Sequence, residues 1–427
     1  MKRLPLPPSL YAQTAPPGPQ TPPLAGHRRV SVAVIGGGFT GLSTALHLAE
    51  QGADVMVLEA QEPGWGASGR NGGQVNPGLK ADPDQVEVDF GPELGGRMLR
   101  LSGGAPGFVF ELIRKHQIEC GALQSGTIRA AYKPRQVAEI QATGEQWLRR
   151  GTPGVLLDPA SCEAATGTRR YAGAFLDRRG GQIQPLAYAR GLARAAIQAG
   201  AAIHGGSPAL SVRRDGGRWH VATPGGTLSA DTLVLATNGY TTELWPRLRR
   251  SVVPVYSAIV ATEPLSERLA RMILPDRSVL YEIGSITVYY RLDRDKRLLM
   301  GGRSAQRDIS RPDELHYLIA YAERLWPNLR GMKWTHAWSG QVAITADHYP
   351  HVHEPAPGVL ACLGYNGRGV AMASAMGQQL AKRVVGGASA EIDMPITGIK
   401  EIPLHGIWKS GVMARLAYGR IRDWLGV

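Results

Sequence analysis

The sequence predicts an α/β protein in which a parallel sheet with flanking helices is combined with a second, antiparallel sheet. The first observation is the stretch 29–60, where two short apolar runs enclose a glycine-rich turn and a helical pattern. The second is a series of short strand patterns in 252–302, separated by turn residues. The third is another apolar run with a glycine-rich turn at 359–370. Parallel-sheet material therefore lies towards both ends of the chain, with antiparallel material between.

The stretch 29–60 has the pattern of a strand–turn–helix–strand unit. An apolar run over 32–35 ends at Gly36, and Leu and Ala then recur at helical spacing until Gly52. A second apolar run, 55–58, ends at Glu59. This arrangement indicates a Rossmann-like domain that binds a dinucleotide, although the motif alone does not distinguish a nicotinamide from a flavin cofactor.

The glycines of the first turn each have a physical reason. Gly36 permits the tight turn, Gly38 lets the backbone approach a pyrophosphate, and Gly41 lets the helix pack closely against the strand. The helix that begins at Phe39 and Thr40 offers N–H groups and a partial positive charge to the phosphates.

A second glycine-rich segment, 63–78, follows the second strand almost directly. Glu59 ends that strand, where its carboxylate can accept hydrogen bonds from both ribose hydroxyls, with Ala60 beside it. Glycine lets the backbone of the segment pass close to a flat ligand, and its polar side chains supply hydrogen bonds. The residues assigned to this contact are Gly66, Ser68, Arg70, Asn71, Gly72, Gly73 and Gln74. Such a segment indicates a second ring system, such as a flavin.

These motifs together resemble the FAD-dependent D-amino-acid-oxidase-type family. The resemblance is carried by GGGFTG at 36–41, by Glu59 and by GWGASGRNGGQ at 64–74, and it extends from Pro5 to about Trp424. Within the family the chain is most similar to the branch that includes gamma-glutamylputrescine oxidoreductases. The resemblance implies FAD as the cofactor and a discontinuous FAD-binding domain with an inserted α+β substrate domain built on an antiparallel sheet. Non-covalent binding is expected because Cys362 lies on the strand before the late turn, as a buried structural thiol would.

Three later segments gain a role from the resemblance. Thr237 and Asn238 end an apolar strand that lies close to FAD in the family, and Ala209 matches a position whose backbone meets the adenine. The turn after the strand 359–363 matches one that lies at the flavin pyrimidine. The residues carried over there are Gly364, Asn366, Gly367, Arg368, Gly369 and Val370. Arg368 departs from the family pattern, because related turns often carry His.

The expected domain division alternates between the two sheets. An extended arm covers 1–28 and an amphipathic C-terminal helix covers 401–427. The expected FAD-binding segments are 29–105, 156–250 and 338–400, and the expected substrate-domain segments are 106–155 and 251–337.

The substrate pocket is expected on the antiparallel sheet. In the strand pattern 286–292, Thr287, Tyr289 and Arg291 share one face. Arg291 or Arg303 could clamp a substrate carboxylate through two hydrogen bonds, and Tyr256 and Tyr365 could form aromatic walls around an amine. For each of these side chains a structural role is an equal alternative. His348 and Cys362 are interpreted as structural.

Composition excludes several classes of protein. Net charge is +13, but the Lys and Arg residues are dispersed without runs, so we expect no nucleic-acid partner. The three cysteines have no metal-binding or disulfide spacing, which indicates a reducing, cytoplasmic location and no metal site. The prolines of 1–28 argue against a secretory signal and predict an arm draped over the surface. Peripheral membrane contact through the basic C-terminal helix is the less favoured interpretation.

The predicted activity is oxidation of a C–N bond of an amine or amino acid, with hydride transfer to the flavin N5 and oxygen or an electron carrier as final acceptor. Two alternatives stay open: a dehydrogenase that uses an acceptor other than oxygen, and a non-catalytic flavoprotein subunit. The second glycine-rich turn and the segment 64–74 disfavour a nicotinamide dehydrogenase. The late motif, which lacks a Gly-Asp pair, disfavours a flavin hydroxylase.

Overall fold

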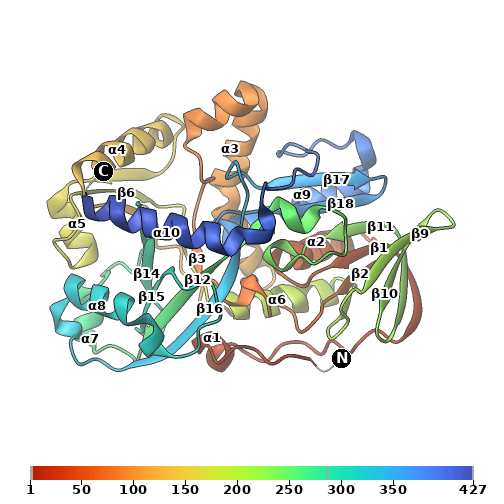
Figure 1. Ribbon diagram of the computed structural model, residues 1–427, viewed down its shortest axis with the longest axis horizontal. Helices are drawn as coiled ribbons and strands as arrows, with labels where there is room; N and C mark the ends of the chain where they lie inside the picture. Colours follow the sequence, from red (N-terminus) through yellow and green to blue (C-terminus); the bar gives the residue numbers. More distant parts are fainter. Residues whose placement is uncertain (1–2, 285–286, 426–427) are drawn as a thin grey trace.

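The computed structural model describes residues 3–284 and 287–425 and arranges them around two large sheets (Figure 1). The helices are α1 (Leu10–Thr14), α2 (Phe39–Glu50), α3 (Pro83–Lys115), α4 (Pro134–Arg149), α5 (Pro159–Thr166), α6 (Pro185–Gln198), α7 (Glu267–Met272), α8 (His316–Leu325), α9 (Gly369–Gly386) and α10 (Trp408–Leu425). The strands in the first half are β1 (Gly26–Ile35), β2 (Val55–Leu58), β3 (Gln74–Val75), β4 (Thr127–Ala131), β5 (Gly154–Leu157), β6 (Gly173–Asp177), β7 (Gly181–Gln182), β8 (Ala202–His204) and β9 (Ser211–Asp215). Those in the second half are β10 (Arg218–Thr223), β11 (Gly226–Leu235), β12 (Val253–Thr262), β13 (Val279–Glu282), β14 (Val288–Leu292), β15 (Leu298–Arg303), β16 (Trp334–Ile344), β17 (His351–Ala356) and β18 (Val359–Leu363).

The first sheet is the predicted Rossmann-like sheet. Its strands follow the order β17-β18-β11-β1-β2-β8, and β10 and β9 extend from β11. The pairs from β18 to β8 are parallel, so their carboxyl ends meet at one edge. Ligands of such sheets bind outside this edge.

Both faces of the first sheet are buried, as a parallel sheet requires. Val34 and Val57 point into a core that also contains apolar residues of α2, α3, α6 and α9. Ile35 and Leu58 alternate with them and point into the opposite core, which includes Trp219 of β10. Because side chains on both faces of β1 and β2 are buried, these strands consist of continuous apolar runs where they cross the core.

The second sheet follows the order β16-β12-β15-β14-β13-β4-β6-β5. Its pairs are antiparallel except for β13 with β4. The predicted antiparallel sheet is confirmed, but β12 pairs with β15 and not with β13, so the four strands do not form a simple meander. Ile286, which the sequence analysis placed at the start of β14, lies outside the described residues.

The positions of the elements suggest other domain boundaries than those expected. All of α3 packs in the core of the first sheet, up to Ile118 and Cys120. In contrast, β5 and β6 belong to the second sheet, and β16 continues in that sheet to Ile344. We therefore propose substrate-domain segments of about 121–179 and 253–344, in place of 106–155 and 251–337.

The N-terminal arm does more than cover the surface. It is mostly extended, but Ser9 caps a short helix, α1, whose residues Leu10 and Tyr11 are buried. They contact Leu186 of α6 and strand residues of the second sheet. The prediction of a surface arm was wrong for this part, because Leu10 and Tyr11 provide enough apolar surface to bury.

Two helices end or bend for local reasons. Helix α8 ends at Leu325, because Pro327 disfavours helical angles at Trp326, where φ is −134°. Helix α3 has non-helical backbone angles inside it at Gly91.

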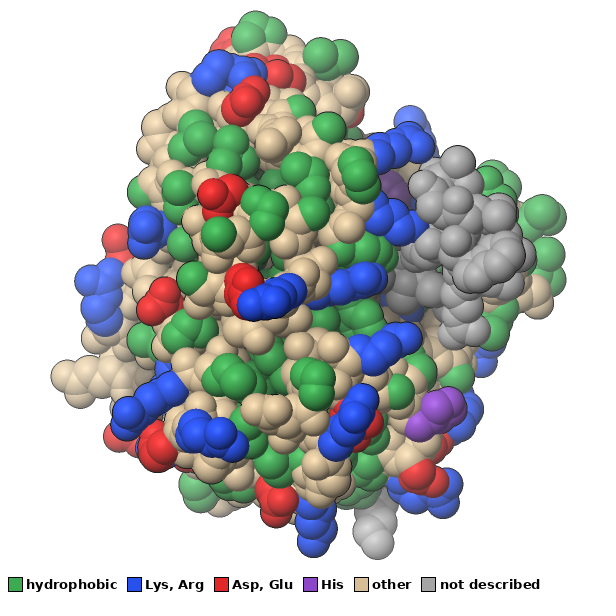
Figure 2. Space-filling model, turned by 90° about the vertical axis from the view of Figure 1, so that its left-hand side faces the viewer, with side chains coloured by type: hydrophobic (Ala, Val, Ile, Leu, Met, Phe, Trp, Pro, Cys, Tyr) green, Lys and Arg blue, Asp and Glu red, His purple; other side chains and the backbone are tan. Residues whose placement is uncertain are grey.

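The C-terminal helix α10 extends across the front of the molecule in Figure 1. Its side chains at 416, 417 and 419–427 lie outside the described residues, so its amphipathic character stays a prediction. Within the described ranges, we find no helix with the length and apolar character to cross a bilayer. On the face in Figure 2, Lys and Arg are interspersed with acidic and apolar side chains.

Candidate active site

A cavity of about 840 Å³ opens between the carboxyl edge of the first sheet and the second sheet. Its lining comes from the β1–α2 turn, the segment 59–76, strands β12, β14 and β16, and the β18–α9 turn. The residues predicted for the site line this cavity, with four exceptions: Gly41, Gly73, Arg291 and Gly364. Chain segments more than 300 residues apart in the sequence, 36–41 and 364–370, therefore meet at one site.

The β1–α2 turn has the geometry that its glycines predict. Gly36 has a φ of +109°, and a Cβ there would lie 2.7 Å from the carbonyl oxygen of Ala236. A Cβ at Gly41 would collide with the carbonyl oxygen of Gly36, so Gly41 serves packing and not the cavity surface. Helix α2 begins after Gly38, which has no side chain to cap it, and its first turn contains no acidic residue. Its N-terminus therefore suits an anionic group.

Glu59 lies at the end of β2 and lines the cavity. Its carboxylate accepts hydrogen bonds from the backbone N–H groups of Gly37, at 2.7 Å, and Gln61, at 2.9 Å. Burial raises the pKa of Glu59, and these hydrogen bonds oppose the shift.

The glycine-rich segment uses its polar side chains mainly within the protein. Ser68 Oγ accepts from Phe39 N–H at 2.9 Å, which joins the segment to the start of α2. Asn71 donates to the carbonyl oxygens of Ala67 and Ser68, and its own oxygen accepts from Gly73 N–H. The guanidinium of Arg70 lies over the Trp65 ring at 4.1 Å. These contacts fix the conformation of the loop, and its backbone is the part available to a ligand.

Gln74 connects the glycine-rich segment to the second sheet by hydrogen bonds. Its amide nitrogen donates to the carbonyl oxygens of Leu280 and Tyr290, at 2.9 and 3.2 Å. A Cβ at Gly72 would lie 2.7 Å from the Tyr289 ring. Glycine is therefore needed where the loop passes under β14.

The β18–α9 turn closes the other side of the cavity. Asn238 Oδ1 accepts from Gly364 N–H at 2.9 Å, and Asn366 Oδ1 accepts from Thr345 N–H at 3.0 Å. Gly364 has a φ of +81° and packs against Thr345 outside the cavity lining. Helix α9 also begins without a side-chain cap or an acidic residue in its first turn. A second helix N-terminus therefore borders the cavity.

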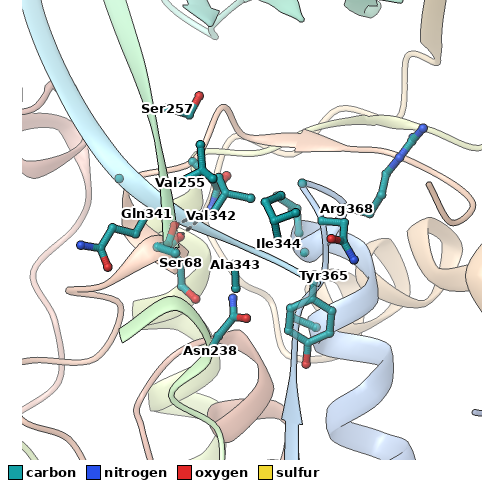
Figure 3. Close-up of a pocket in the computed structure, with 18 of the residues that line it drawn as sticks. Ser68, Asn238, Val255, Ser257, Gln341, Val342, Ala343, Ile344, Tyr365 and Arg368 are labelled. Atoms are coloured by element: carbon teal, nitrogen blue, oxygen red, sulfur yellow. Dashed lines mark hydrogen bonds between the residues drawn. The ribbon is translucent and has the colours of Figure 1, made fainter. Parts of the chain in front are cut away.

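Tyr365 presents its ring to the cavity and turns its hydroxyl away. The hydroxyl lies 2.6 Å from Thr40 Oγ1 and 3.2 Å from Cys362 Sγ. Burial raises the pKa of Tyr365 well above 10 and that of the fully buried Cys362 to about 12. In Figure 3, Tyr365 and Arg368 extend in opposite directions from the turn, below and beside the β16 residues Val342, Ala343 and Ile344.

The wall contributed by the second sheet contains two of the predicted tyrosines. Tyr256 accepts a hydrogen bond from Gln341 Nε2 at 2.8 Å, and the Tyr289 hydroxyl lies 3.0 Å from Ser257 Oγ. Burial raises the pKa of Tyr289, so this group stays neutral. This part of the wall is therefore aromatic.

Arg291 does not reach the cavity. Its Nε donates to the Gly72 carbonyl oxygen at 2.7 Å, and its Nη1 donates to Gln182 Oε1 at 2.9 Å. Its Nη2 donates to the Tyr11 hydroxyl at 3.1 Å. The structure thus gives Arg291, which is 2% exposed, a structural role in place of the predicted substrate clamp. The alternation of Tyr289 and Arg291 correctly puts both on one face, but the loop 72–73 lies between Arg291 and the cavity.

The cavity lining also contains charged and polar residues that the sequence analysis missed. They are Lys80, Arg129, Lys133, Arg135, Glu139, Tyr281 and Glu282. His348, interpreted as structural, also lines the cavity and has a φ of +62°. Lys80 directly follows the glycine-rich segment, which could have drawn attention to it. The others come from β4, α4 and β13, which carry no motif.

Comparisons with known proteins agree with this geometry. The family model described as FAD dependent oxidoreductase matches residues 31–383. The chain is 33% identical to the gamma-glutamylputrescine oxidoreductase of Escherichia coli K12 over 411 residues, with 93% of each chain covered. It is also 33% identical over 388 residues to a probable oxidoreductase, OrdL, of Rhizobium meliloti strain 1021, with 90% of each chain covered.

Solved structures show the same fold. The glycine oxidase of Geobacillus kaustophilus matches with a TM-score of 0.72 and 22% identity, covering 88% of this chain and 99% of that one. The L-proline dehydrogenase of P. horikoshii matches with a TM-score of 0.70 and 18% identity, covering 86% and 96%. The predicted resemblance is confirmed: this chain belongs to the FAD-dependent oxidoreductase family represented by D-amino-acid oxidase, and its cofactor is FAD.

Proposed function

We propose that the protein oxidises a C–N bond of an amine or amino acid to an imine, which water then hydrolyses. The observation that carries the proposal is one cavity bordered by two helix starts without an acidic residue in their first turns, at Gly38 and Arg368, and by the aromatic side chains of Tyr256 and Tyr289. The relatives named gamma-glutamylputrescine oxidoreductase and glycine oxidase support an amine or amino-acid substrate.

The first part of the cavity suits FAD. The N-terminus of α2 can hold the pyrophosphate, Glu59 can accept from the ribose, and Ala209 lines the adenine end. The β18–α9 turn suits the pyrimidine of the flavin, where the start of α9 stabilises negative charge. When bound, FAD supplies the hydride acceptor of the reaction.

The remaining residues position the substrate and keep its amine neutral. Tyr256 and Tyr289 form a wall that restricts the amine-bearing carbon. His348 lies in the same cavity, and burial together with the nearby charge of Lys80 lowers its pKa. His348 is therefore neutral at pH 7 and able to accept the proton of a substrate ammonium.

We also infer non-covalent binding of FAD and a cytoplasmic location. Cys362, the thiol closest in sequence to the turn, is buried behind Tyr365 and is absent from the cavity lining among the described residues. All three cysteines are unpaired and buried, which suits a reducing compartment.

The test is the visible spectrum of the purified holoenzyme, recorded without oxygen before and after addition of amines and amino acids. We expect at least one amine to bleach the flavin, and the matching alcohol to leave it unchanged. Bleaching by none of a broad panel would contradict the proposal and favour a non-catalytic flavoprotein. Admitting air to the reduced protein then distinguishes an oxidase, which regains its colour within seconds, from a dehydrogenase that needs another acceptor.

A further inference from the structure

Three cationic side chains line the same cavity, and we refer to Lys80, Arg303 and Arg368 as the cation cluster. The charges of Arg303 and Arg368 both act on Lys80. The three residues come from separate parts of the chain. Lys80 follows β3, Arg303 ends β15, and Arg368 precedes α9. The fold therefore brings these charges together, since no single sequence motif does.

The cation cluster has no carboxylate partner among the described residues. Within the ranges 3–284 and 287–425, none of its members makes an ion pair. Arg368 donates to two neutral acceptors, the Pro77 carbonyl oxygen at 3.1 Å and the Tyr281 hydroxyl at 2.8 Å. No described carboxylate therefore neutralises the charges of the cluster.

The acidic residues of this region are already engaged. Glu139 accepts from Arg129 at 2.8 Å, and Asp82 lies 3.4 Å from the same guanidinium. Glu282 accepts from the hydroxyls of Tyr171 and Tyr321, at 2.7 and 2.6 Å. Burial raises the pKa of Glu282, which weakens it further as a counterion. An incoming ligand must therefore supply the negative charge that the cation cluster lacks.

The cations influence one another, as like charges that border one cavity do. Lys80 lines the cavity and retains an exposed surface. Partial burial and the charges of Arg368 and Arg129 lower the pKa of Lys80 to about 8. Arg303 acts in the same direction on Lys80, and Glu139 acts in the opposite one.

We propose that the substrate carries a second carboxylate in addition to that of an ordinary amino acid, and that the cation cluster binds the two. The proposal deepens the function proposed above and rests on it. A single carboxylate would leave two of the three cations without a counterion, whereas a dicarboxylic amine neutralises most of the cluster. Arg303 offers a planar pair of donors to one carboxylate, and Lys80 and Arg368 offer charge to the other.

The experiment uses the holoenzyme and two unreactive probes of equal length, succinate and butyrate. Binding is followed by the shift of the flavin absorption band. We expect succinate to bind at least about tenfold more tightly than butyrate. A rise in ionic strength from about 0.05 to 0.5 M should weaken succinate more than butyrate, because charged groups in a cleft are screened by salt.

Variants assign the effect to the cation cluster. Lys80→Met and Arg303→Gln should each reduce the preference for succinate to about threefold or less. Lys80→Met should also raise the melting temperature of the ligand-free holoenzyme, because it removes one positive charge from among like charges. The matched control is Lys382→Met on the exposed side of α9, which should change neither quantity.

The pH dependence gives an independent readout. Succinate affinity should fall as pH rises through about 8, because Lys80 loses its proton there. The other charged groups that face Lys80 are Arg129, Arg303, Arg368 and Glu139, with Arg415 of α10 near Arg303. Burial and the charge of Lys80 lower the pKa of His348, the nearby histidine, below its usual 6.5. The decrease should vanish in Lys80→Met.

Two outcomes would overturn the inference: equal affinities for succinate and butyrate, or a preference that survives both variants. Its failure is distinguishable from failure of the proposed function. If glutamine reduces the flavin as fast as glutamate does, in either enantiomer, the inferred second carboxylate is wrong, but C–N oxidation is still supported. If succinate binds tightly and in a salt-sensitive way but no amine reduces the flavin, the anion site is supported and the proposed activity is wrong.

Discussion

Gly36 is the residue whose backbone conformation the turn beside the FAD site requires. Its φ of +109° disfavours any side chain, and a Cβ would lie 2.7 Å from the carbonyl oxygen of Ala236. We expect Gly36→Ala to destabilise the protein by about 3 kcal/mol and to abolish retention of FAD. The measurements are urea unfolding and the flavin-to-protein absorbance ratio. Gly52→Ala is the control, because its φ of +78° carries similar backbone strain without a contact in reach. It should cost about 1–2 kcal/mol and keep the flavin.

His348 carries a prediction about the reaction rate. If it accepts the ammonium proton of the substrate, His348→Asn should slow anaerobic flavin reduction at pH 7 by about 10²–10⁴-fold. Asn tolerates the φ of +62° at this position, so the backbone should be retained. The rate should recover as pH approaches the pKa of the free amine, where the proton is lost to water. An unchanged pH profile would leave His348 with a structural role only.

Single residues also show where sequence analysis succeeds and where it stops. The roles of Gly36 and Gly41 follow from a local motif, and the structure has the expected turn and close packing. Arg291 was assigned wrongly, because strand alternation gives the face of a side chain and not what lies in front of it. Lys80 and Arg129 were missed, since only tertiary structure brings β4, β15 and the β18–α9 turn to one cavity.

At the scale of elements, the contact between α2 and α9 aligns the two helix starts that border the cavity. A Cβ at Gly377 of α9 would lie 2.5 Å from Ser43 Cβ and 2.8 Å from Thr44 N, both in α2. We expect Gly377→Ala to force the helices apart, with a loss of about 1–3 kcal/mol in the free energy of unfolding and weaker FAD binding. Calorimetry of the variant with and without added FAD measures both effects.

The matched control for this helix contact is Gly104→Ala, in α3. Gly104 is exposed, and a Cβ there would meet nothing within 4 Å. Alanine has the higher helix propensity, so this variant should gain about 0.5–1 kcal/mol of stability and bind FAD normally. Similar behaviour of the two variants would mean that helix propensity, and not the α2–α9 distance, governs Gly377.

The elements themselves were largely predictable, and their partners less so. Apolar runs and glycine turns locate β1, α2, β18 and α9, because local patterns determine such elements. The pairing of β12 with β15, and of β4 with β13, depends on contacts between distant segments. The same reason explains why the domain boundaries proposed from the structure differ from those expected.

At the scale of the whole molecule, the N-terminal arm connects the two sheets. The Arg190 and Arg194 side chains of α6 donate to the carbonyl oxygens of Pro16 and Pro17, which attaches the arm to the first half of the fold. Leu10 and Tyr11 of the arm belong to one apolar cluster with Ile259 and Leu299 of the second sheet. The arm therefore resists relative movement of the two walls of the cavity.

This arrangement predicts a coupled loss of stability and activity far from the flavin. Leu10→Ala removes a side chain that is 2% exposed and should lower the free energy of unfolding by about 2–4 kcal/mol. Tyr11→Phe leaves the buried Nη2 of Arg291 without its acceptor and should lower it by about 1–3 kcal/mol. Because Arg291 also holds the Gly72 carbonyl, both variants should weaken substrate binding without contact to the substrate. Leu4→Ala, at a site that is 56% exposed, should change stability by less than about 0.5 kcal/mol. Thermal unfolding and substrate titration of the three variants test whether the arm couples stability to substrate binding. Normal substrate affinity in a destabilised Tyr11→Phe protein would mean that the arm only stabilises the fold.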